Sequence, residues 1–271
     1  MKDLKGKVIV ITGASSGIGF ACCKVFAQAG LKVVMAARNP EKLATAEEAV
    51  KAITPDVLAV PTDVSVEADC KNLIEQAVAR FGGIDIMLNN AGISMRALFR
   101  DLDLSVIRRL MDTNFWGTVQ CTKYAFPYIL ERQGSIIGIS SVAGFIGLPG
   151  RTGYSASKFA MHGFLETVRV ENLKNNLHVM IVTPGFTASN IRVTALGPQG
   201  QAQGESPRDE GKMMTAEAVA RRILKGVRRR RRRIVLTFEG KAVCFLKGLC
   251  PALLDKMQYA YMRREPNSPF K

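Results

Sequence analysis

Tyr154 and Lys158 are four positions apart, and their types and spacing are suited to proton transfer. In a helix, side chains at positions i and i+4 project from the same face. A free tyrosine has a pKa of about 10 and exchanges protons poorly at neutral pH, but a neighbouring ammonium favours the phenolate. We therefore expect Lys158 to lower the pKa of Tyr154 toward neutral pH. The alternative is a helix that merely has one polar face.

Ser141 follows an apolar run over residues 135–139 and precedes Tyr154 by thirteen positions. Such a run is typical of a buried strand. A hydroxyl at the end of that strand is placed to donate a hydrogen bond to a substrate oxygen and to hold this oxygen near the tyrosine. The serine, tyrosine and lysine together predict acid–base chemistry on a substrate oxygen.

A glycine-rich turn lies between the first apolar run, residues 8–11, and a helical pattern of apolar residues. Glycine lets the backbone approach a pyrophosphate closely, and the following helix supplies free N–H groups and the positive end of its dipole. Any tight strand-to-helix turn can use glycine, but the strand before and the helix after are the context that the motif requires. We predict that a dinucleotide is bound by Gly13, Ser15, Ser16, Gly17, Ile18 and Gly19.

The end of the second apolar run indicates which dinucleotide is bound. Where a fold specific for NAD places a carboxylate on the ribose hydroxyls, this chain has Ala37 and then Arg38. Arg38 offers a fork of donors to a 2′-phosphate, and Ser15 or Ser16 can add hydroxyls, so the sequence favours NADP(H). The alternative is a solvated arginine that begins the next helix. Asp63 is placed either to bond the adenine amino group or to cap the helix that follows it.

The apolar pattern predicts the scaffold that brings these residues together. Short apolar runs alternate with segments whose apolar residues are three and four apart, as in crossover helices. This alternation over about 180 residues predicts an α/β fold, a single Rossmann-type doubly wound parallel sheet flanked by helices. Ligands of such a sheet bind beyond the carboxyl ends of the strands. The predicted strands cover residues 8–11, 32–36, 57–60, 84–88, 135–139, 178–182 and 234–236.

Taken together, the motifs and their order resemble those of the short-chain dehydrogenase/reductase family over about residues 5 to 190. The glycine turn, Ser141, Tyr154 and Lys158 carry part of this resemblance. The other shared motifs are Asn89-Asn90-Ala91-Gly92, Asn114 within residues 113–117, and Pro184-Gly185. In this combination the motifs are highly specific for the family.

The resemblance implies roles for the matching residues and an activity, the interconversion of a carbonyl and a secondary alcohol by hydride transfer. Tyr154 is then the general acid/base and Ser141 orients the substrate. Lys158 binds the nicotinamide ribose and modulates Tyr154, and Asn114 holds a relay water. Thr187 is expected to bond the nicotinamide carboxamide. The implied cofactor-binding residues also include Val64, Asn90, Ala91, Gly92, Pro184 and Gly185.

The family further implies the strand order 3-2-1-4-5-6-7 and a homodimer or homotetramer built on the helices after strands four and five. Residues 186–214 are rich in glycine, glutamine and proline, and we expect them to form a lid that orders over the substrate. An apolar wall near the site would favour a hydrophobic lipid, steroid or 3-oxoacyl carbonyl over a sugar, unless its side chains only pack the lid. The expected wall is Phe145, Ile146, Leu148, Phe186 and Ile191.

Composition limits the other classes of function. The six cysteines form no CxxC pair and the two histidines are far apart, so we predict no metal site and expect reduced thiols. No apolar run has the length of a membrane-spanning helix, and the first residues lack a signal-peptide pattern. These features predict a soluble, cytoplasmic protein.

The net charge of +15 is concentrated near the end of the chain, because residues 212–271 hold 16 basic and 4 acidic side chains. We expect a catalytic domain over 1–240 and a basic helical extension over 241–271. In the extension, apolar residues at helical spacing lie among lysines and arginines, a pattern suited either to an anionic membrane surface or to packing on the protein. The extension is also loosely similar to that of membrane-associated reductases of lipid and steroid carbonyls.

The arginine run Arg228–Arg233 suggests a rival from another class, a regulatory protein that binds NADP(H) without turnover and uses its basic tail on nucleic acid or membrane. Clustered arginines give salt-sensitive contacts to phosphates. The run has no interleaved aromatic residues for stacking bases, and a sensor needs no catalytic set. Nucleic acid is therefore disfavoured as a partner, and the enzyme is the preferred interpretation.

Overall fold

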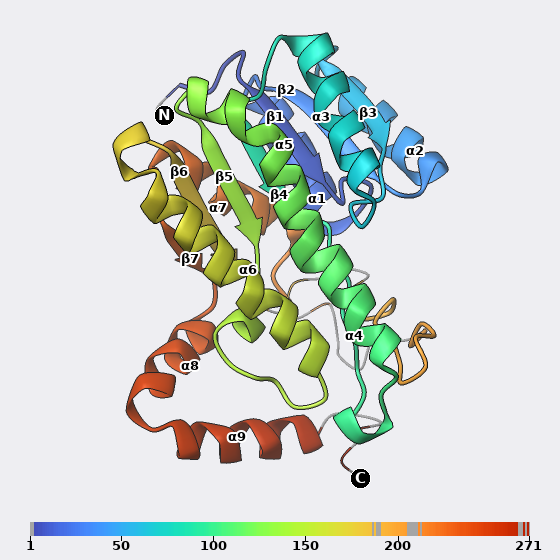
Figure 1. Cartoon of the computed structure of the whole chain (residues 1–271), viewed down its shortest axis with the longest axis vertical. Helices are drawn as coiled ribbons and strands as arrows, with labels where there is room; N and C mark the ends of the chain where they lie inside the picture. The colour runs from blue at the N-terminus through green and yellow to red at the C-terminus, as the bar shows by residue number, and fades with distance from the viewer. Residues whose placement is uncertain are drawn as a thin grey trace.

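The computed structural model describes residues 3–185, 187, 191–204, 211, 213–264, 268 and 270. Within them, parallel strands form one seven-stranded sheet in the order β3-β2-β1-β4-β5-β6-β7 (Figure 1). The first strand pairs with both the second and the fourth, so the strand order reverses between them. The predicted fold class and strand order are confirmed. The strands are β1 (Val8–Thr12), β2 (Lys32–Ala37), β3 (Val57–Pro61), β4 (Ile86–Asn89), β5 (Ser135–Ile139), β6 (His178–Thr183) and β7 (Arg233–Val235).

Helices connect the strands and cover both faces of the sheet. Because a parallel sheet is buried on both faces, its strands are apolar without alternation, as the fully buried Val8–Thr12 illustrates. The α-helices are α1 (Gly17–Gln28), α2 (Pro40–Lys51), α3 (Glu67–Phe81), α4 (Leu104–Leu110), α5 (Gly117–Glu131), α6 (Thr152–Glu171), α7 (Ala216–Arg228), α8 (Phe238–Leu249) and α9 (Pro251–Arg263). Short helical turns are η1 (Phe99–Asp101), the π-helical η2 (Met111–Trp116), η3 (Val142–Gly144) and η4 (Leu173–Asn175).

Side-chain caps and turns fix several of these boundaries. Asn39 accepts a hydrogen bond from the Lys42 amide at 2.8 Å and so begins α2, with Pro40 at the first helical position. Helix α3 ends at Gly82, whose φ of 75° lies in the left-handed region that glycine adopts without strain. These two helix boundaries therefore follow from local sequence signals.

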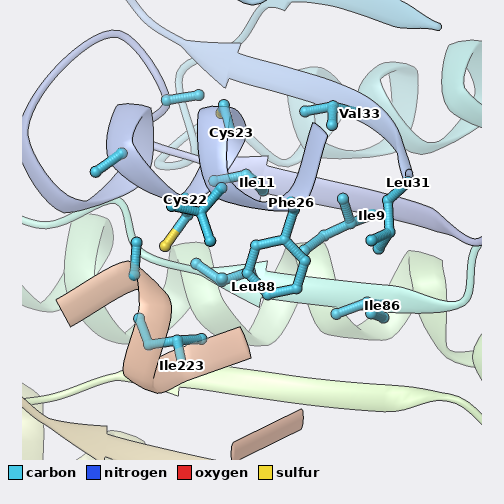
Figure 2. Packing of buried hydrophobic residues seen from close by; sticks show 14 of the residues in the cluster. Ile9, Ile11, Cys22, Cys23, Phe26, Leu31, Val33, Ile86, Leu88 and Ile223 are labelled. Atoms are coloured by element: carbon cyan, nitrogen blue, oxygen red, sulfur yellow. The ribbon is translucent and has the colours of Figure 1, made fainter. Parts of the chain in front are cut away.

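One face of the sheet packs against α1, α2 and α7. Figure 2 shows Cys22 and Phe26 from α1, and Ile223 from α7, converging on Ile9 of β1 and Leu88 of β4. All five side chains are fully buried. This layer fixes the position of α1, and with it the glycine turn that precedes the helix.

The opposite face packs against α3, α5 and α6, which lie in front of the strands in Figure 1. Met161 and Leu165 of α6 enter this core, so the helix that carries Tyr154 and Lys158 is fixed along its length. A smaller apolar cluster around Met95, Val106 and Leu196 lies against Tyr154. The two catalytic candidates therefore sit on a helix held by two separate clusters.

Helix α8 begins at Phe238, three positions before the expected start of the C-terminal extension at residue 241. The Thr237 side chain accepts a hydrogen bond from the Gly240 amide at 3.2 Å, and this cap starts α8 at Phe238. The expected boundary falls inside that helix, and the division into a catalytic domain and an extension stays a prediction. Across the described part of the chain, each helix is too short or too polar to span a lipid bilayer.

Candidate active site

A cleft of about 710 Å³ opens at the carboxyl ends of the central strands. It extends from the glycine turn after β1, past the loop after β4, to the loop after β6, which is the position expected for a ligand of a doubly wound sheet. Most predicted site residues line it together: Gly13, Ser15, Ser16, Gly17, Ile18, Arg38, Val64, Asn90, Ala91, Gly92, Ser141, Tyr154, Lys158, Pro184, Gly185 and Thr187.

The glycine turn is held against the loop after β4 by Asn90. Its amide nitrogen Nδ2 donates to the carbonyl oxygens of Thr12 and Gly13, at 2.9 and 3.2 Å. Gly13 has a φ of +65°, and a Cβ there would lie 2.8 Å from Asn90 Nδ2. Gly19 does not line the cleft, because its Cα faces the carbonyl oxygen of Gly13, where a Cβ would lie at 2.2 Å. The glycines thus serve close backbone packing as well as access to the cleft.

Thr12 begins the glycine motif, but the sequence interpretation gave it no role of its own. Its hydroxyl Oγ1 accepts hydrogen bonds from the backbone amides of Asn90 and Ala91, both at 3.0 Å. The side chain is buried at the point where β1 and β4 diverge. A threonine that immediately precedes a glycine turn was the available sequence signal.

Arg38 lies at the rim of the cleft, at the end of β2, and its side chain is 59% exposed. Its nearest carboxylate is that of Asp63, with Nη1 and Oδ2 3.9 Å apart. Asp63 does not line the cleft, although Thr62 and Val64 on either side of it do. The Asp63 oxygen Oδ1 instead accepts from the Ser65 amide and hydroxyl, at 2.9 and 2.6 Å. The adenine contact of Asp63 therefore stays a prediction.

Ser141, Tyr154 and Lys158 meet at the other end of the cleft. Ser141 begins η3 directly after β5, and its Oγ accepts a hydrogen bond from the Ala143 amide at 3.2 Å. Lys158 Nζ donates to the Ile139 carbonyl oxygen at 2.9 Å and lies 5.8 Å from the centre of the Tyr154 ring. The sheet and α6 therefore bring a hydroxyl, a phenol and an ammonium to one place.

The pKa of Tyr154 moves in the direction opposite to the one expected from its spacing to Lys158. Burial raises the pKa of Tyr154, outweighing the lowering effects of a hydrogen bond with Ser141 and of the charge on Arg151. Burial also lowers the pKa of Lys158 to about 8. The expectation that the pKa of Tyr154 is lowered is thus wrong for this structure, because the desolvation of the phenol dominates. Tyr154 is a neutral phenol at neutral pH.

Asn114 lies behind the cleft in the π-helical turn η2, fully buried. Its side-chain amide accepts from the Ile93 N–H at 2.8 Å, and donates to the Ile93 carbonyl oxygen at 3.0 Å and to Ser157 Oγ at 2.9 Å. Ser157, a residue that the sequence interpretation missed, in turn donates to the Tyr154 carbonyl oxygen at 2.8 Å. Asn114 therefore ties the loop after β4 to α6, and its role with a relay water stays a prediction.

His162 is a second residue that the sequence interpretation missed, although it lies four positions after Lys158 on the same helix. Its Nε2 is 2.6 Å from Ser140 Oγ, and its ring packs edge-on against Phe145. Burial, followed by the charges on Lys158 and Arg233, lowers the pKa of His162 to about 4. A neutral imidazole thus supports the loop that carries Ser141.

The expected apolar wall and lid are brought to the cleft only in part. Ile191 lines the cleft, whereas Phe145 packs on His162 and Arg233, Ile146 is buried, and the Leu148 amide bonds to the helix that carries Tyr154. Phe186 lies outside the described residues, as do 188–190, 205–210 and 212 of the expected lid. The described part of the lid is anchored: Leu196 donates to the Ser94 carbonyl and accepts from the Arg96 amide, both at 2.8 Å.

The arginine run does not form one uniform patch. Arg230 has a φ of 48°, and its guanidinium donates to the backbone carbonyl oxygens of Gln133 and Asn176. Gln133 lies in the turn before β5 and Asn176 in the turn before β6, so Arg230 joins these two turns. Arg233 lies over the Phe145 ring, with 5.2 Å between its guanidinium carbon and the ring centre. At least these two arginines make contacts within the protein.

The comparison with protein families matches residues 7–197 to the short chain dehydrogenase family. The chain is 32% identical to the mouse dehydrogenase/reductase SDR family member 7B, over 98% of this chain and 84% of that protein. It is also 32% identical to the Arabidopsis thaliana 11-beta-hydroxysteroid dehydrogenase 1A, over 94% and 75%. The fold matches a short chain dehydrogenase/reductase from Burkholderia phymatum, solved in complex with NAD, with a TM-score of 0.84 and 25% identity over 93% of this chain and 96% of that one.

Proposed function

The chain belongs to the short-chain dehydrogenase family, and we propose that it is an NADP(H)-dependent enzyme that interconverts a hydrophobic carbonyl compound and its secondary alcohol. The observation that carries this proposal is the single cleft that joins a glycine turn at one end to Ser141, Tyr154 and Lys158 at the other. The cleft fits a dinucleotide, because α1 begins at this turn with no acidic residue in its first turn and so presents a positive dipole end.

The protonation state of Tyr154, a neutral phenol, is the one that carbonyl reduction requires. A neutral phenol has a proton to give to the substrate oxygen, and the Ser141 hydroxyl is placed to hold that oxygen beside it. When bound, NADPH supplies the hydride that the carbonyl carbon receives. Proton transfer leaves Tyr154 as a phenolate. The positive charge of Lys158, 5.8 Å from the centre of the tyrosine ring, stabilises this negative charge. The reverse transfer oxidises the alcohol.

The preference for NADP(H) rests on Arg38. Arg38 lines the same cleft as Ser15 and Ser16, and Ala37 occupies the position where a ribose-binding carboxylate would favour NAD. A separation of 3.9 Å from Asp63 on the exposed surface makes a weak ion pair, so Arg38 keeps donors for a phosphate. The NAD named with the Burkholderia phymatum structure is a property of that protein.

The hydrophobic substrate class rests on Ile191 at the cleft and on the apolar cluster of Met95, Leu196 and Ile93 against Tyr154. Apolar walls with a few polar groups are typical of sites for small hydrophobic ligands. Two Arabidopsis thaliana relatives carry the name 11-beta-hydroxysteroid dehydrogenase, which is consistent with a lipid or steroid carbonyl. We therefore place lipid, steroid and 3-oxoacyl carbonyls first among candidates.

A carbonyl screen tests the proposal. The protein is mixed with NADPH or NADH and with panels of steroid, lipid, 3-oxoacyl and sugar carbonyls, and oxidation of the nicotinamide is followed by absorbance. We expect turnover with hydrophobic ketones and a higher kcat/KM for NADPH. Equal kcat/KM for both dinucleotides would overturn the Arg38 argument, and turnover of sugars alone would overturn the substrate class.

A further inference from the structure

The two C-terminal helices expose an unusual share of the large apolar side chains of this protein. Fifteen such side chains are exposed in the described part of the chain, and seven of them lie on α8 and α9. Phe238 is 82% exposed and Phe245 is 68% exposed. Exposed apolar residues that are scattered singly are ordinary, but a contiguous group indicates an interaction surface. The seven are Phe238, Phe245, Leu249, Leu253, Met257, Tyr259 and Tyr261.

The spacing of these residues places them in stripes. Phe238, Phe245 and Leu249 are seven and four positions apart on α8, and Leu253, Met257 and Tyr261 are four apart on α9. Both sets recur on one face of a helix. Lysines and arginines lie beside the stripes, and the segment 238–264 holds five cations against two carboxylates. The five cations are all exposed: Lys247 is bound to the protein body, and Lys241, Lys256, Arg263 and Arg264 remain beside the stripes.

Contacts with the protein body fix which faces are outward. Lys247 Nζ donates to the Phe145 carbonyl oxygen and lies 4.8 Å from the centre of the Phe159 ring, so α8 is tied to η3 and α6. On α9, Leu254 and Met262 are buried, and Ser268 Oγ donates to the Met262 carbonyl oxygen at 3.0 Å. The inward side of α9 is therefore already used. The exposed stripes are what remains on the outside.

We propose that α8 and α9 form a docking surface for an anionic lipid bilayer, with the apolar stripes in the interface and the flanking cations on the lipid headgroups. An apolar face bordered by cations matches the apolar and anionic layers of such a bilayer in both character and charge. A partner protein is a poorer match for this surface, because lysine is depleted in protein–protein interfaces. The flanking charge thus selects the bilayer among the occupants of this surface.

The surface adjoins the cleft. Helix α8 follows β7 at the edge where the strands end, and its first residues pack on that edge: a Cβ on Gly185 would lie 2.0 Å from Thr237 Cγ2, and one on Gly240 would lie 3.3 Å from Val142 Cγ2. In Figure 1 both helices lie below the tip of β5, the end toward which the strand arrow points. A bilayer on this surface would therefore face the same end of the molecule as the cleft.

Residues 228–232 of the arginine run lie at the other end of β7 and are not part of this surface, whereas Arg233 begins β7 and lies over the Phe145 ring. Residues 228–232 precede β7, and Arg230 bonds to Gln133 and Asn176 in the turns where β5 and β6 begin. The α8 and α9 helices follow β7 at the opposite edge. This separation gives the test an internal control, because two groups of cations on one molecule should respond differently.

Vesicle co-sedimentation of the full chain tests the docking surface without any substrate. We expect binding to vesicles of phosphatidylcholine with phosphatidylserine, and weaker binding to phosphatidylcholine alone. The variant Phe245→Ser/Leu253→Ser/Met257→Ser should bind at least about tenfold more weakly. The control Val170→Ser/Leu173→Ser removes two exposed apolar residues, one at the end of α6 and one in η4, and should bind like the unaltered protein.

Charge variants separate the two basic regions. Lys256→Gln/Arg263→Gln should weaken binding to the anionic vesicles by about fivefold for each charge removed. Arg231→Gln/Arg232→Gln removes the same charge from the arginine run and should change binding much less. Equal losses from both pairs would overturn the assignment to α8 and α9, as would an absence of binding by the unaltered protein.

Labelling of Cys250 provides a measurement that needs no apolar variant. Cys250 is the exposed thiol between α8 and α9, while Cys22, Cys23, Cys70 and Cys121 are buried, and Cys244→Ser removes the half-buried one. An environment-sensitive dye on Cys250 should shift to shorter wavelength when anionic vesicles are added. No shift on vesicles that sediment the protein would contradict the proposal. If Phe245→Ser/Leu253→Ser/Met257→Ser changed the oligomeric state but not vesicle binding, the surface would be assigned to a second copy of the chain instead.

Discussion

At the scale of single residues, the site is governed by how each polar group is buried. Desolvation raises the pKa of Tyr154 and outweighs the hydrogen bond with Ser141, and the same cause lowers the pKa of Lys158 to about 8. Sequence spacing predicted that these groups meet but gave the wrong direction for the tyrosine. The sign of such a shift depends on burial, which spacing alone does not reveal.

Arg38 is expected to decide between the two dinucleotides. Arg38→Gln should raise KM for NADPH by about tenfold or more, because a charge-assisted contact to the 2′-phosphate is lost, and should leave KM for NADH unchanged. Steady-state kinetics with each dinucleotide measure this. The control Lys51→Gln removes an exposed positive charge from α2, where Lys51 pairs with Glu47 and Glu48. If Arg38→Gln raised both KM values equally, the proposed phosphate contact would be refuted.

His178 should make the protein less stable in mild acid. Burial lowers its pKa to about 4, with Nδ1 2.9 Å from Ser135 Oγ and Nε2 2.9 Å from the Arg231 carbonyl oxygen. The unfolded chain takes up this proton near pH 6.5 and the folded protein only near pH 4, so the free energy of unfolding falls as pH decreases between these values. His178→Gln should reduce the number of protons taken up on unfolding in this pH range by up to one. Denaturant titrations at several pH values measure this as a smaller slope of the unfolding free energy against pH. An unchanged slope would show that His178 does not contribute.

At the scale of elements, the π-helical turn η2 ties the site together. It places Asn114 so that one amide bonds both the backbone of Ile93 and the hydroxyl of Ser157, joining the loop after β4 to α6. π-Helical turns are frequent at functional sites. The glycine turn and the order of strands were predictable, because apolar runs and punctuating glycines are local signals. The π-helical turn and the support of Ser140 by His162 were not, since both depend on contacts between distant segments.

Asn114→Ala should lower the free energy of unfolding by about 2–4 kcal/mol, because the half-buried backbone groups of Ile93 and the buried hydroxyl of Ser157 lose their partner. Chemical denaturation monitored by circular dichroism measures this. Asn172→Ala is a matched control, since this buried asparagine bonds only within its own segment, to Val168 and Asn175, and should cost less. Equal losses for the two variants would contradict a joining role for Asn114.

At the scale of the whole molecule, one edge of the sheet carries the cleft and, beside it, the C-terminal helices (Figure 1). The sequence predicted an amphipathic, basic extension but not which face would remain exposed, because the inward contacts of Leu254, Met262 and Lys247 are tertiary. It also treated the arginine run as one patch, whereas Arg230 and Arg233 hold separate parts of the body. The oligomeric state stays a prediction from the family resemblance.

The most direct measurement of the central claim compares the unaltered protein with Tyr154→Phe for oxidation of NADPH by a hydrophobic ketone. The phenylalanine keeps the ring but has no proton to give. We predict that kcat falls by about 10²–10⁴-fold, the contribution typical of a general acid, while NADPH binding measured by fluorescence is unchanged. A Tyr154→Phe variant that reduces the ketone at the unaltered rate would contradict the account.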